Sequence, residues 1–497
     1  MSAKNVEHKF IVPNSVEVRD YQVNLANQAK NENCLIILPT GLGKTVVALH
    51  VIADYLTKGN GGVLFLAPTK VLVNQHYEFL KNTLAIDDIA LITGEDLLTK
   101  RKKLWINSVI CATPEITRND IARKIVDTAQ FNLIIFDEAH RAVGDYAYVE
   151  IAKQLNKSNV RLLGMTATLP SEKEKAKEIC DNLHVRGLAE RNDSSPDVKP
   201  YIQETKTEWV TVDLSPDLKV IQRYLKLALD QRYTELRRNG LRLSDNKSLS
   251  QLLNSRQFVL KRNIRSAKPL FTAIRITYAL NIFEAHGITP FLKFCDRTKS
   301  KKGAGIKDLF ETDQNFMKAI DLAKNQQAND IEHPKIDKLV EILRNIESKV
   351  LIFSSYRDSV DVIQKKLVSM DITAEILIGK SGQTGLKQEK QIETVQRFRD
   401  GVTKALVATR VGEEGLDISE VNLVIFYDNV PSSIRFIQRK GRTGRKDTGR
   451  LVVLIAKDTI DEAYYWIGRK KVKLASNMAD KITKHLEKKE QVMDDFF

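Results

Sequence analysis

Leu38-Pro-Thr-Gly-Leu-Gly-Lys-Thr45 is the stretch that decides the fold of this 497-residue chain. A short apolar run at 33–37 precedes it and an apolar pattern with helical spacing at 46–56 follows it, so a strand, a glycine turn and a helix succeed one another. Gly41 and Gly43 allow a tight turn that points backbone N–H groups at one anion, and the helix N-terminus adds the positive end of its dipole. This context predicts a phosphate-binding loop.

Two side chains at the end of the loop indicate which phosphate ligand it takes. Lys44 is suited to the β- and γ-phosphates of a nucleotide, and the Thr45 hydroxyl is suited to Mg²⁺. We therefore expect ATP and Mg²⁺ here. The expected ATP contacts are Leu38, Pro39, Thr40, Gly41, Leu42, Gly43, Lys44 and Thr45. The strict motif has Gly where this chain has Leu38, so the match by itself leaves an ordinary glycine turn as the alternative.

Composition and charge narrow the class of protein. The chain is too long for one core, and about three domains are expected. It has no long uncharged apolar window and no apolar signal core, so we expect no membrane span and a cytoplasmic protein. Four cysteines without metal-ligand spacing are expected to be reduced thiols. A net charge of +15 and a pI of about 9.3 favour a polyanionic partner, most simply nucleic acid.

Strand-like apolar runs alternate with helical patterns in two separate parts of the chain, which predicts two parallel sheets covered by helices. The predicted strands are 33–37, 62–68, 108–114, 131–136 and 160–166 in the first part, and 349–353, 405–409, 423–427 and 450–455 in the second. Between the two parts the spacing predicts helices, with one helix expected over 258–286 and bent at Pro269. The segment 217–330 holds 22 Lys or Arg and 11 Asp or Glu, a net charge of +11. This basic surface either grips a polyanion or is an ordinary solvated face.

We therefore expect an α/β protein with a basic helical insert between two sheet domains. The expected segments are 1–204 for the first sheet domain, 205–330 for the insert, 331–470 for the second sheet domain and 471–497 for a lysine-rich C-terminal tail.

An acidic pair closes the predicted strand 131–136. Asp137 is suited to hold Mg²⁺, and Glu138 is suited to orient and deprotonate an attacking water. The carboxyl end of a parallel strand is where such sheets bind ligands. Acids that cap a helix are common, so the pair becomes a strong signal only because a phosphate loop precedes it.

Two further motifs are suited to the same chemistry. Thr166 and Thr168 follow the next predicted strand and are expected to link the nucleotide site to another domain, although a plain strand-end turn is the alternative. Near the C-terminus, Gln438 opens a Gln-Arg-Lys-Gly-Arg-Thr-Gly-Arg motif in which Arg442 and Arg445 are candidate arginine fingers across a domain cleft. A basic surface loop is the alternative for this motif.

Together these motifs resemble the superfamily 2 helicases, over nearly the whole chain. The resemblance implies two RecA-like domains with a DEAH box at 137–140. It implies adenine contacts from Arg19 and Gln22, a ribose contact from Asp417, and coupling of the nucleotide to nucleic acid through His140, Thr166 and Thr168. The residues implied to contact nucleic acid are Thr69, Lys70, Thr93, Gly94, Thr113, Ser354 and Thr409. The catalytic residues implied are Lys44, Glu138, Gln438, Arg442 and Arg445.

Within that superfamily the chain is most similar to the Hef and FANCM type, by the segments 137–148, 195–200, 411–417 and 461–466. This likeness implies action on forked or branched DNA in replication-fork repair, with 3′ to 5′ movement. Hef proteins commonly continue into an XPF-type nuclease with a Glu-Arg-Lys core, which this sequence does not have. Strand cleavage is therefore not expected from the chain, and a separate structure-specific nuclease is a candidate partner.

The C-terminal stretch Glu490–Phe497 resembles a sliding-clamp peptide, with Met493, Phe496 and Phe497 at the required spacing. A frayed tail is the alternative, because the pattern wants Gln where this chain has Glu490.

Two other functions remain open from the sequence. One is an RNA-duplex-dependent ATPase of the RIG-I-like kind, which shares the core layout and a helical insert. The other is a nucleotide-gated scaffold that binds DNA without stimulated turnover.

Overall fold

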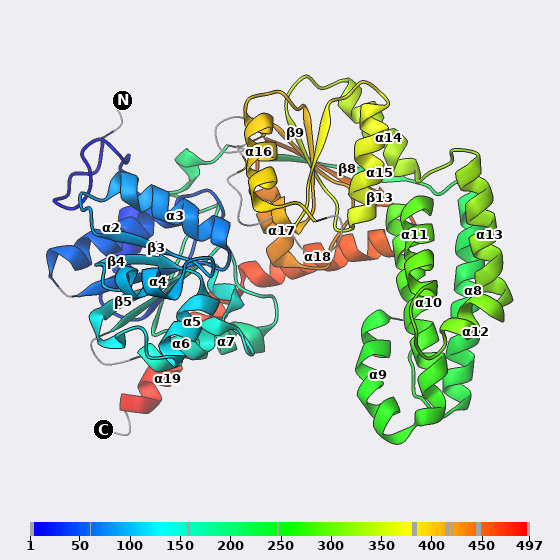
Figure 1. The fold of residues 1–497 in the computed structure, drawn as a ribbon, viewed down its shortest axis with the longest axis horizontal. Helices are drawn as coiled ribbons and strands as arrows, with labels where there is room; N and C mark the ends of the chain where they lie inside the picture. The colour runs from blue at the N-terminus through cyan, green and yellow to red at the C-terminus, as the bar shows by residue number, and fades with distance from the viewer. Residues whose placement is uncertain are drawn as a thin grey trace.

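The computed structural model describes residues 4–59, 61–156, 160–203, 205–245, 248–379, 385–412, 418, 421–443 and 449–494, without the side chains of 488–494. It consists of two sheet domains and a helical insert that projects from the second sheet domain (Figure 1). The predicted fold class is confirmed, because both sheets are parallel and are covered by helices.

The first sheet has seven strands in the order β3-β4-β2-β5-β6-β1-β7. The strands are β1 (Cys34–Ile37), β2 (Gly62–Leu66), β3 (Ile89–Ile92), β4 (Val109–Ala112), β5 (Phe131–Phe136), β6 (Arg161–Thr166) and β7 (Gly187–Glu190). The helices are α1 (Asp20–Ala29), α2 (Lys44–Thr57), α3 (Lys70–Thr83), α4 (Leu98–Leu104), α5 (Pro114–Ala122), α6 (Ala147–Leu155) and α7 (Lys173–Asn182).

Alternate side chains of each strand enter two different cores. Leu35 and Ile37 of β1 face one apolar cluster, and Cys34 and Ile36 face the other. A sheet buried on both faces gives continuous apolar runs in the sequence, which is why its central strands were predictable. The two outermost strands, β3 and β7, were not predicted; each has one neighbouring strand and is partly exposed, whereas the equally short β1 and β4 are fully buried.

The second sheet has six strands in the order β10-β11-β9-β12-β13-β8. The strands are β8 (Thr205–Val212), β9 (Val350–Phe353), β10 (Ala374–Leu377), β11 (Ala405–Ala408), β12 (Leu423–Phe426) and β13 (Gly449–Ala456). The helices around it are α14 (Pro334–Arg344), α15 (Arg357–Val368), α16 (Gln388–Arg399) and α17 (Ser433–Lys440).

Strand β8 lies elsewhere than the sequence suggested. Residues 205–212 open the segment expected to form the insert, yet they pair with β13 over eight positions and form the edge of the second sheet. Glu208 on β8 binds Arg450 on β13 through two contacts of 2.9 and 2.7 Å. These residues are 242 positions apart, so no local pattern could reveal the pairing.

The insert is a helical body with its own apolar core. Its helices are α8 (Pro216–Arg238), α9 (Leu249–Arg262), α10 (Ala267–His286), α11 (Ile288–Lys299), α12 (Ile306–Glu311) and α13 (Gln314–Ala328). The single helix expected over 258–286 is wrong: the chain breaks after Arg262, and α10 begins at Ala267. Pro269 lies in the first turn of α10, where its missing N–H costs nothing, so it does not bend a helix.

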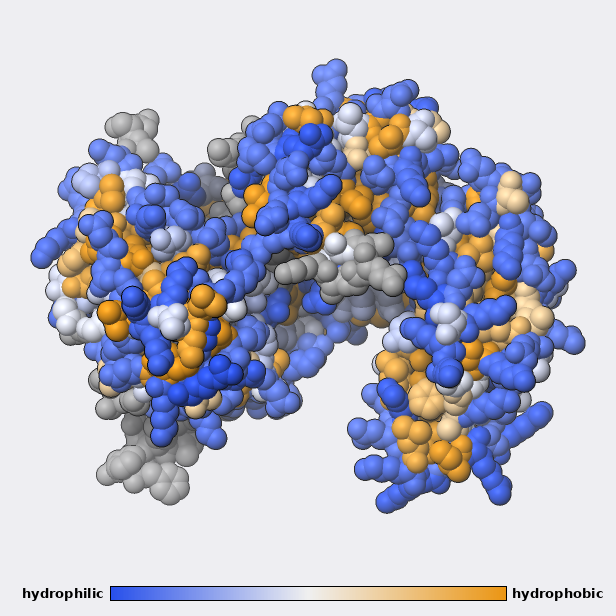
Figure 2. Space-filling model, in the orientation of Figure 1, coloured by the Kyte–Doolittle hydropathy of each residue, from blue (hydrophilic) through white to orange (hydrophobic). Residues whose placement is uncertain are grey.

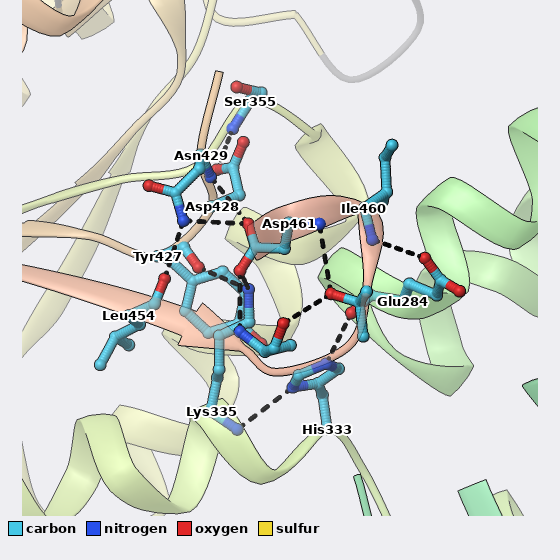
Figure 3. Close-up of polar contacts among 12 residues, drawn as sticks. Glu284, His333, Lys335, Ser355, Tyr427, Asp428, Asn429, Leu454, Ile460 and Asp461 are labelled. Carbon is cyan, nitrogen blue, oxygen red and sulfur yellow. Dashed lines mark hydrogen bonds and ion pairs between the residues drawn. The ribbon is translucent and has the colours of Figure 1, made fainter. Parts of the chain in front are cut away.

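A buried polar network fixes the insert to the second sheet domain (Figure 3). Glu284 of α10 accepts a hydrogen bond from the Ile460 backbone N–H at 2.7 Å, and its own carbonyl oxygen lies 3.0 Å from His333 Nε2. Lys335 Nζ donates to Asp461 at 3.0 Å, with both side chains fully buried. Because the buried side chains of Glu284 and His333 take part in the contacts between α10 and this domain, we infer that the insert and the second sheet domain move as one unit.

Two helices at the C-terminal end connect the domains. α18 (Ile460–Ser476) packs against α17 and α10, and α19 (Met478–Asp494) packs against β7 and α7 (Figure 1). Met478, Ala479 and Ile482 are buried in a core of the first sheet domain. The segment 471–497, expected to be a tail, is thus largely a docked helix in its described part. All four cysteines are buried free thiols, and none of the described helices is long and apolar enough to cross a membrane.

Candidate nucleotide and nucleic-acid site

The phosphate loop has the conformation its glycines require. Gly41 and Gly43 have φ values of 87° and 81°, in the left-handed region, and α2 begins directly after Gly43. A Cβ on Gly43 would collide with the side-chain amide of Gln22. Lys44 Nζ lies 3.4 Å from the Leu38 carbonyl oxygen, so the ammonium lies over the loop.

Gln22 and its neighbour Tyr21 form hydrogen bonds to the backbone of this loop. Gln22 Nε2 donates to the Leu42 carbonyl at 2.9 Å, and the Tyr21 hydroxyl donates to the same oxygen at 2.8 Å. Both side chains are buried. The structure therefore places Gln22 in contact with the phosphate loop, and its predicted contact with adenine stays a prediction.

Asp137 follows β5 and is held from two sides. The Tyr148 hydroxyl lies 2.7 Å from the Asp137 carbonyl oxygen, and His76 Nε2 lies 2.9 Å from the carboxylate oxygen Oδ2. Burial acts to raise the pKa of Asp137, but the His76 hydrogen bond and the charge of Lys44 outweigh it and hold the pKa below its usual value. The carboxylate is therefore ionised and ready to accept a cation.

Glu138 has a left-handed backbone, with a φ of 50°, and its carboxylate points to His140. His140 Nδ1 lies 3.2 Å from Glu138 Oε2 and 3.2 Å from the Thr166 hydroxyl, which donates to the Thr168 carbonyl at 3.0 Å. His140 and Lys44 lower the pKa of Glu138 against the effect of burial. The three predicted coupling residues thus form a chain of contacts that begins at the predicted water-activating carboxylate, and His140 is the member that contacts it.

Oxygen donors around Lys44 fit Mg²⁺. Thr45 supplies a hydroxyl and Asp137 a carboxylate, and Mg²⁺ prefers one or two such ligands completed by phosphate oxygens and water. Among the described residues no group of three His, Cys, Asp or Glu side chains could hold a metal alone.

The second sheet domain meets this loop through α17. A Cβ on Gly441, just after α17, would lie 2.9 Å from the Thr40 Cβ, so the Gly441 backbone packs closely against the Thr40 side chain. Arg439 anchors α17: its guanidinium is buried between the rings of Phe353 and Phe426 and donates to the Asp428 carbonyl at 3.0 Å.

Gln438 and Arg442 flank this contact, and Gln438 is buried. Arg445 and Asp417 lie outside the described residues, so their expected roles stay predictions.

A cavity of about 870 Å³ extends from the phosphate loop along this boundary. Arg19 and Tyr201 line one side, and Lys440 and Gly441 line the other. The Arg19 guanidinium lies 5.1 Å from the centre of the Tyr201 ring. This cavity has the position expected for the base and ribose of a nucleotide bound at the loop.

The predicted nucleic-acid contacts of the first domain come together at one half of the sheet edge. Thr69 and Lys70 follow β2, Thr93 and Gly94 follow β3, and Thr113 follows β4, and these three strands are neighbours in the sheet. The nucleotide residues follow β1, β5 and β6 in the other half. Parallel strands bring their carboxyl ends to one edge, so the two halves lie side by side.

These contacts are held by local hydrogen bonds and one ion pair. Thr69 caps α3 by accepting from the Leu72 N–H at 3.3 Å, and Lys70 pairs with Glu95. The Thr93 backbone N–H donates to Asp96 at 2.9 Å. In the second sheet, Ser354 and Thr409 directly follow the paired strands β9 and β11, so they too are adjacent.

One residue of the site escaped the sequence analysis. His76 on α3 contacts Asp137 at 2.9 Å and the Thr45 hydroxyl at 3.4 Å, and it is 7% exposed. The only sequence signal was its position close to Thr69 and Lys70, which are predicted to contact nucleic acid.

Comparison with known proteins places the chain in a family. Residues 19–176 match the DEAD/DEAH box helicase family, and residues 334–447 match the helicase conserved C-terminal domain. The crystal structure of the Pyrococcus furiosus Hef helicase domain is similar, with a TM-score of 0.64 and 36% identity, covering 91% of this chain and 98% of that one.

Two longer proteins are also similar. A Methanocaldococcus jannaschii protein, named as a candidate ATP-dependent RNA helicase, is 36% identical over 97% of this chain and 64% of its own length. The Mus musculus Fanconi anemia group M protein homolog is 32% identical over 92% of this chain. The chain spans less than two thirds of the length of the first and 25% of the second. By its two domain matches and its likeness to Hef, the chain belongs to the superfamily 2 helicases, in the branch of Hef and the Fanconi anemia group M protein.

Proposed function

We propose that the chain is an ATP-dependent DNA helicase or translocase that acts on forked or branched DNA in replication-fork repair. The observation that carries this proposal is the contact between Gly441 and Thr40, which brings the arginine motif of one sheet domain against the phosphate loop of the other. A triphosphate held there would be shared by both domains, so its hydrolysis would let the domains separate.

Each residue of the nucleotide site has one task in this proposal. Lys44 binds the phosphates, and Glu138 orients water and takes its proton. Arg442 and Arg445 stabilise charge on the γ-phosphate from the opposite side. Thr45 and Asp137 would hold Mg²⁺, which would supply positive charge to the phosphate oxygens.

The basic surfaces support nucleic acid as the partner. The insert carries a net charge of +11, and hydrophilic side chains cover most of its visible surface, beside a wide hollow that separates it from the first sheet domain (Figure 2). Contacts through threonine hydroxyls, backbone and lysines address phosphates, so binding should fall steeply with salt and depend little on sequence. Movement in the 3′ to 5′ direction is part of the proposal through the family resemblance.

The site assignment is tested by Lys44→Ala. Loss of the ammonium should lower the rate of DNA-stimulated ATP hydrolysis at least 100-fold, because phosphate charge is no longer neutralised, while forked-DNA affinity stays within about twofold. Lys58→Ala, at the exposed end of the same helix, is the matched control and should keep full activity. Unchanged ATP turnover in Lys44→Ala would remove the site from this loop.

RNA is the second candidate partner, since the Methanocaldococcus jannaschii relative is named as an RNA helicase. Forked DNA and double-stranded RNA should be compared as activators of ATP hydrolysis at equal salt. We expect forked DNA to activate more strongly; the reverse result would make the chain an RNA-dependent ATPase. Binding without stimulated turnover by either would favour a nucleotide-gated scaffold.

Two protein partners are also proposed, and both rest on the sequence alone. Glu490–Phe497 is a candidate sliding-clamp peptide, and its side chains lie outside the described part of the chain. A separate structure-specific nuclease would supply strand cleavage. Pull-down of a purified sliding clamp by the chain with and without residues 490–497 tests the first of these.

A further inference from the structure

Helix α3 contributes to three regions of the protein: the predicted nucleic-acid contacts, the second sheet domain and the predicted magnesium ligands. Thr69 and Lys70 lie at its N-terminus among the predicted nucleic-acid contacts. Val71, on the next position, packs against an apolar cluster of the second sheet domain. His76 follows six residues after Lys70, about 9 Å along the helix axis, and contacts both predicted magnesium ligands. A small displacement of this one helix would therefore change all three contacts together.

His76 bridges the two predicted magnesium ligands through its two ring nitrogens. Nε2 lies 2.9 Å from the Asp137 carboxylate oxygen Oδ2, and Nδ1 lies 3.4 Å from the Thr45 hydroxyl oxygen. One rigid ring therefore sets the relative position of the hydroxyl and the carboxylate.

The imidazole is held firmly in this orientation. Its ring centre lies 4.5 Å from that of Phe65 on β2, and little of the side chain is exposed. β2 lies at the boundary between the nucleic-acid half and the nucleotide half of the sheet, because its neighbours are β4 and β5. His76 therefore reaches from the first half into the second.

We propose that His76 is a positioning residue that aligns Thr45 and Asp137 for Mg²⁺ and transmits nucleic-acid binding at the N-terminus of α3 to them. This inference rests on the proposed ATP-dependent function and adds the route by which DNA acts on the nucleotide site. Partners that orient metal ligands in this way typically change metal affinity 10- to 100-fold when removed. Coupling between two binding sites is reciprocal, so magnesium-dependent nucleotide binding should also strengthen DNA binding.

The test measures binding rather than turnover. A fluorescent, non-hydrolysable ATP analogue is mixed with the full chain and titrated with MgCl₂, first without and then with saturating forked DNA. In the wild type, DNA should lower the Mg²⁺ concentration at half-maximal binding. In His76→Leu that concentration should rise about 10-fold and become insensitive to DNA, because neither ligand is oriented.

Three comparisons make the result specific. His76→Gln keeps a donor of similar reach toward Asp137 and should recover most of the Mg²⁺ affinity. Glu78→Gln, on an exposed position of the same helix, should behave as the wild type. Forked-DNA affinity without nucleotide should stay within twofold in all variants. If leucine prevents folding, His76→Asn replaces it, since it is polar but too short to reach Asp137.

An unchanged Mg²⁺ midpoint in His76→Leu, or a DNA effect that persists in it, would overturn the inference. Failure of the proposed function looks different: the wild type itself would then show no DNA-stimulated ATP hydrolysis. Normal stimulation in the wild type together with normal His76→Leu titrations would reject only the role of His76.

Discussion

Single residues of the nucleotide site act through their neighbours. Gly43 must be glycine for two reasons, since its φ of 81° disfavours any side chain and the Gln22 amide occupies the space a Cβ would need. Asp137 and Glu138 remain ionised although buried, because His76, His140 and Lys44 surround them. The sequence identified the acidic pair and the lysine, but it did not identify His76, whose contact with Asp137 spans 61 positions of the chain.

The double constraint on Gly43 gives a prediction at this scale. Gly43→Ala should weaken binding of the ATP analogue at least 10-fold and lower the free energy of unfolding by about 1–3 kcal/mol, because backbone strain and the clash with Gln22 add. Gly59→Ala, at the other end of α2, is the control: its φ is also positive, at 64°, but no atom lies within 4 Å of the new Cβ. Analogue titration and urea denaturation of both variants would decide; equal losses in the two would show that Gln22 is irrelevant.

At the scale of elements, buried polar contacts decide which helices belong together. The Lys335–Asp461 pair joins α14 to α18, and Asp461 also accepts from the Asn429 and Ala456 backbone N–H groups (Figure 3). Removal of one partner from such a pair leaves an uncompensated charge in the interior, which is more costly than the loss of a surface pair.

Lys335→Met should therefore lower the free energy of unfolding by about 3–5 kcal/mol. Lys338→Met removes a lysine of the same helix that pairs with Glu341 in solvent, and should cost less than about 1 kcal/mol. Urea denaturation followed by circular dichroism measures both. A similar small cost for the two variants would mean that the buried Lys335–Asp461 pair does not stabilise the packing of α14 against α18.

Across the whole molecule, the half-buried His50 and the buried His286 and His333 link stability to pH. Burial lowers the pKa of His50 from 6.5 to about 4, and it also lowers the pKa values of His286 and His333. Their neutral forms are therefore favoured by folding, and the unfolded chain binds more protons below pH 6.5. Stability is fully present above that pH and is lost as the pH falls from 6.5 toward 4.

The melting temperature should accordingly decrease between pH 7 and pH 5, as measured by differential scanning fluorimetry. His50→Gln should make this decrease shallower without removing it, because His286 and His333 still resist protonation in the folded state. A melting temperature that stays constant over this range would contradict the lowered pKa values of these histidines.

The sequence by itself determined those features that short stretches encode. The phosphate loop, the acidic pair and the central strands follow from glycines, carboxylates and apolar runs that lie within a few residues of one another, and so the fold class and family were predictable. Only the tertiary structure decided that β8 joins the second sheet, that α19 docks on the first, and that His76 reaches Thr45 and Asp137. Each of these depends on contacts between residues distant in the sequence, up to 242 positions for β8, whose pairing leaves no periodic trace in either segment. The meeting of Gly441 with Thr40 is of the same kind, since two domains packed together, rather than any local pattern, bring the arginine motif to the phosphate loop.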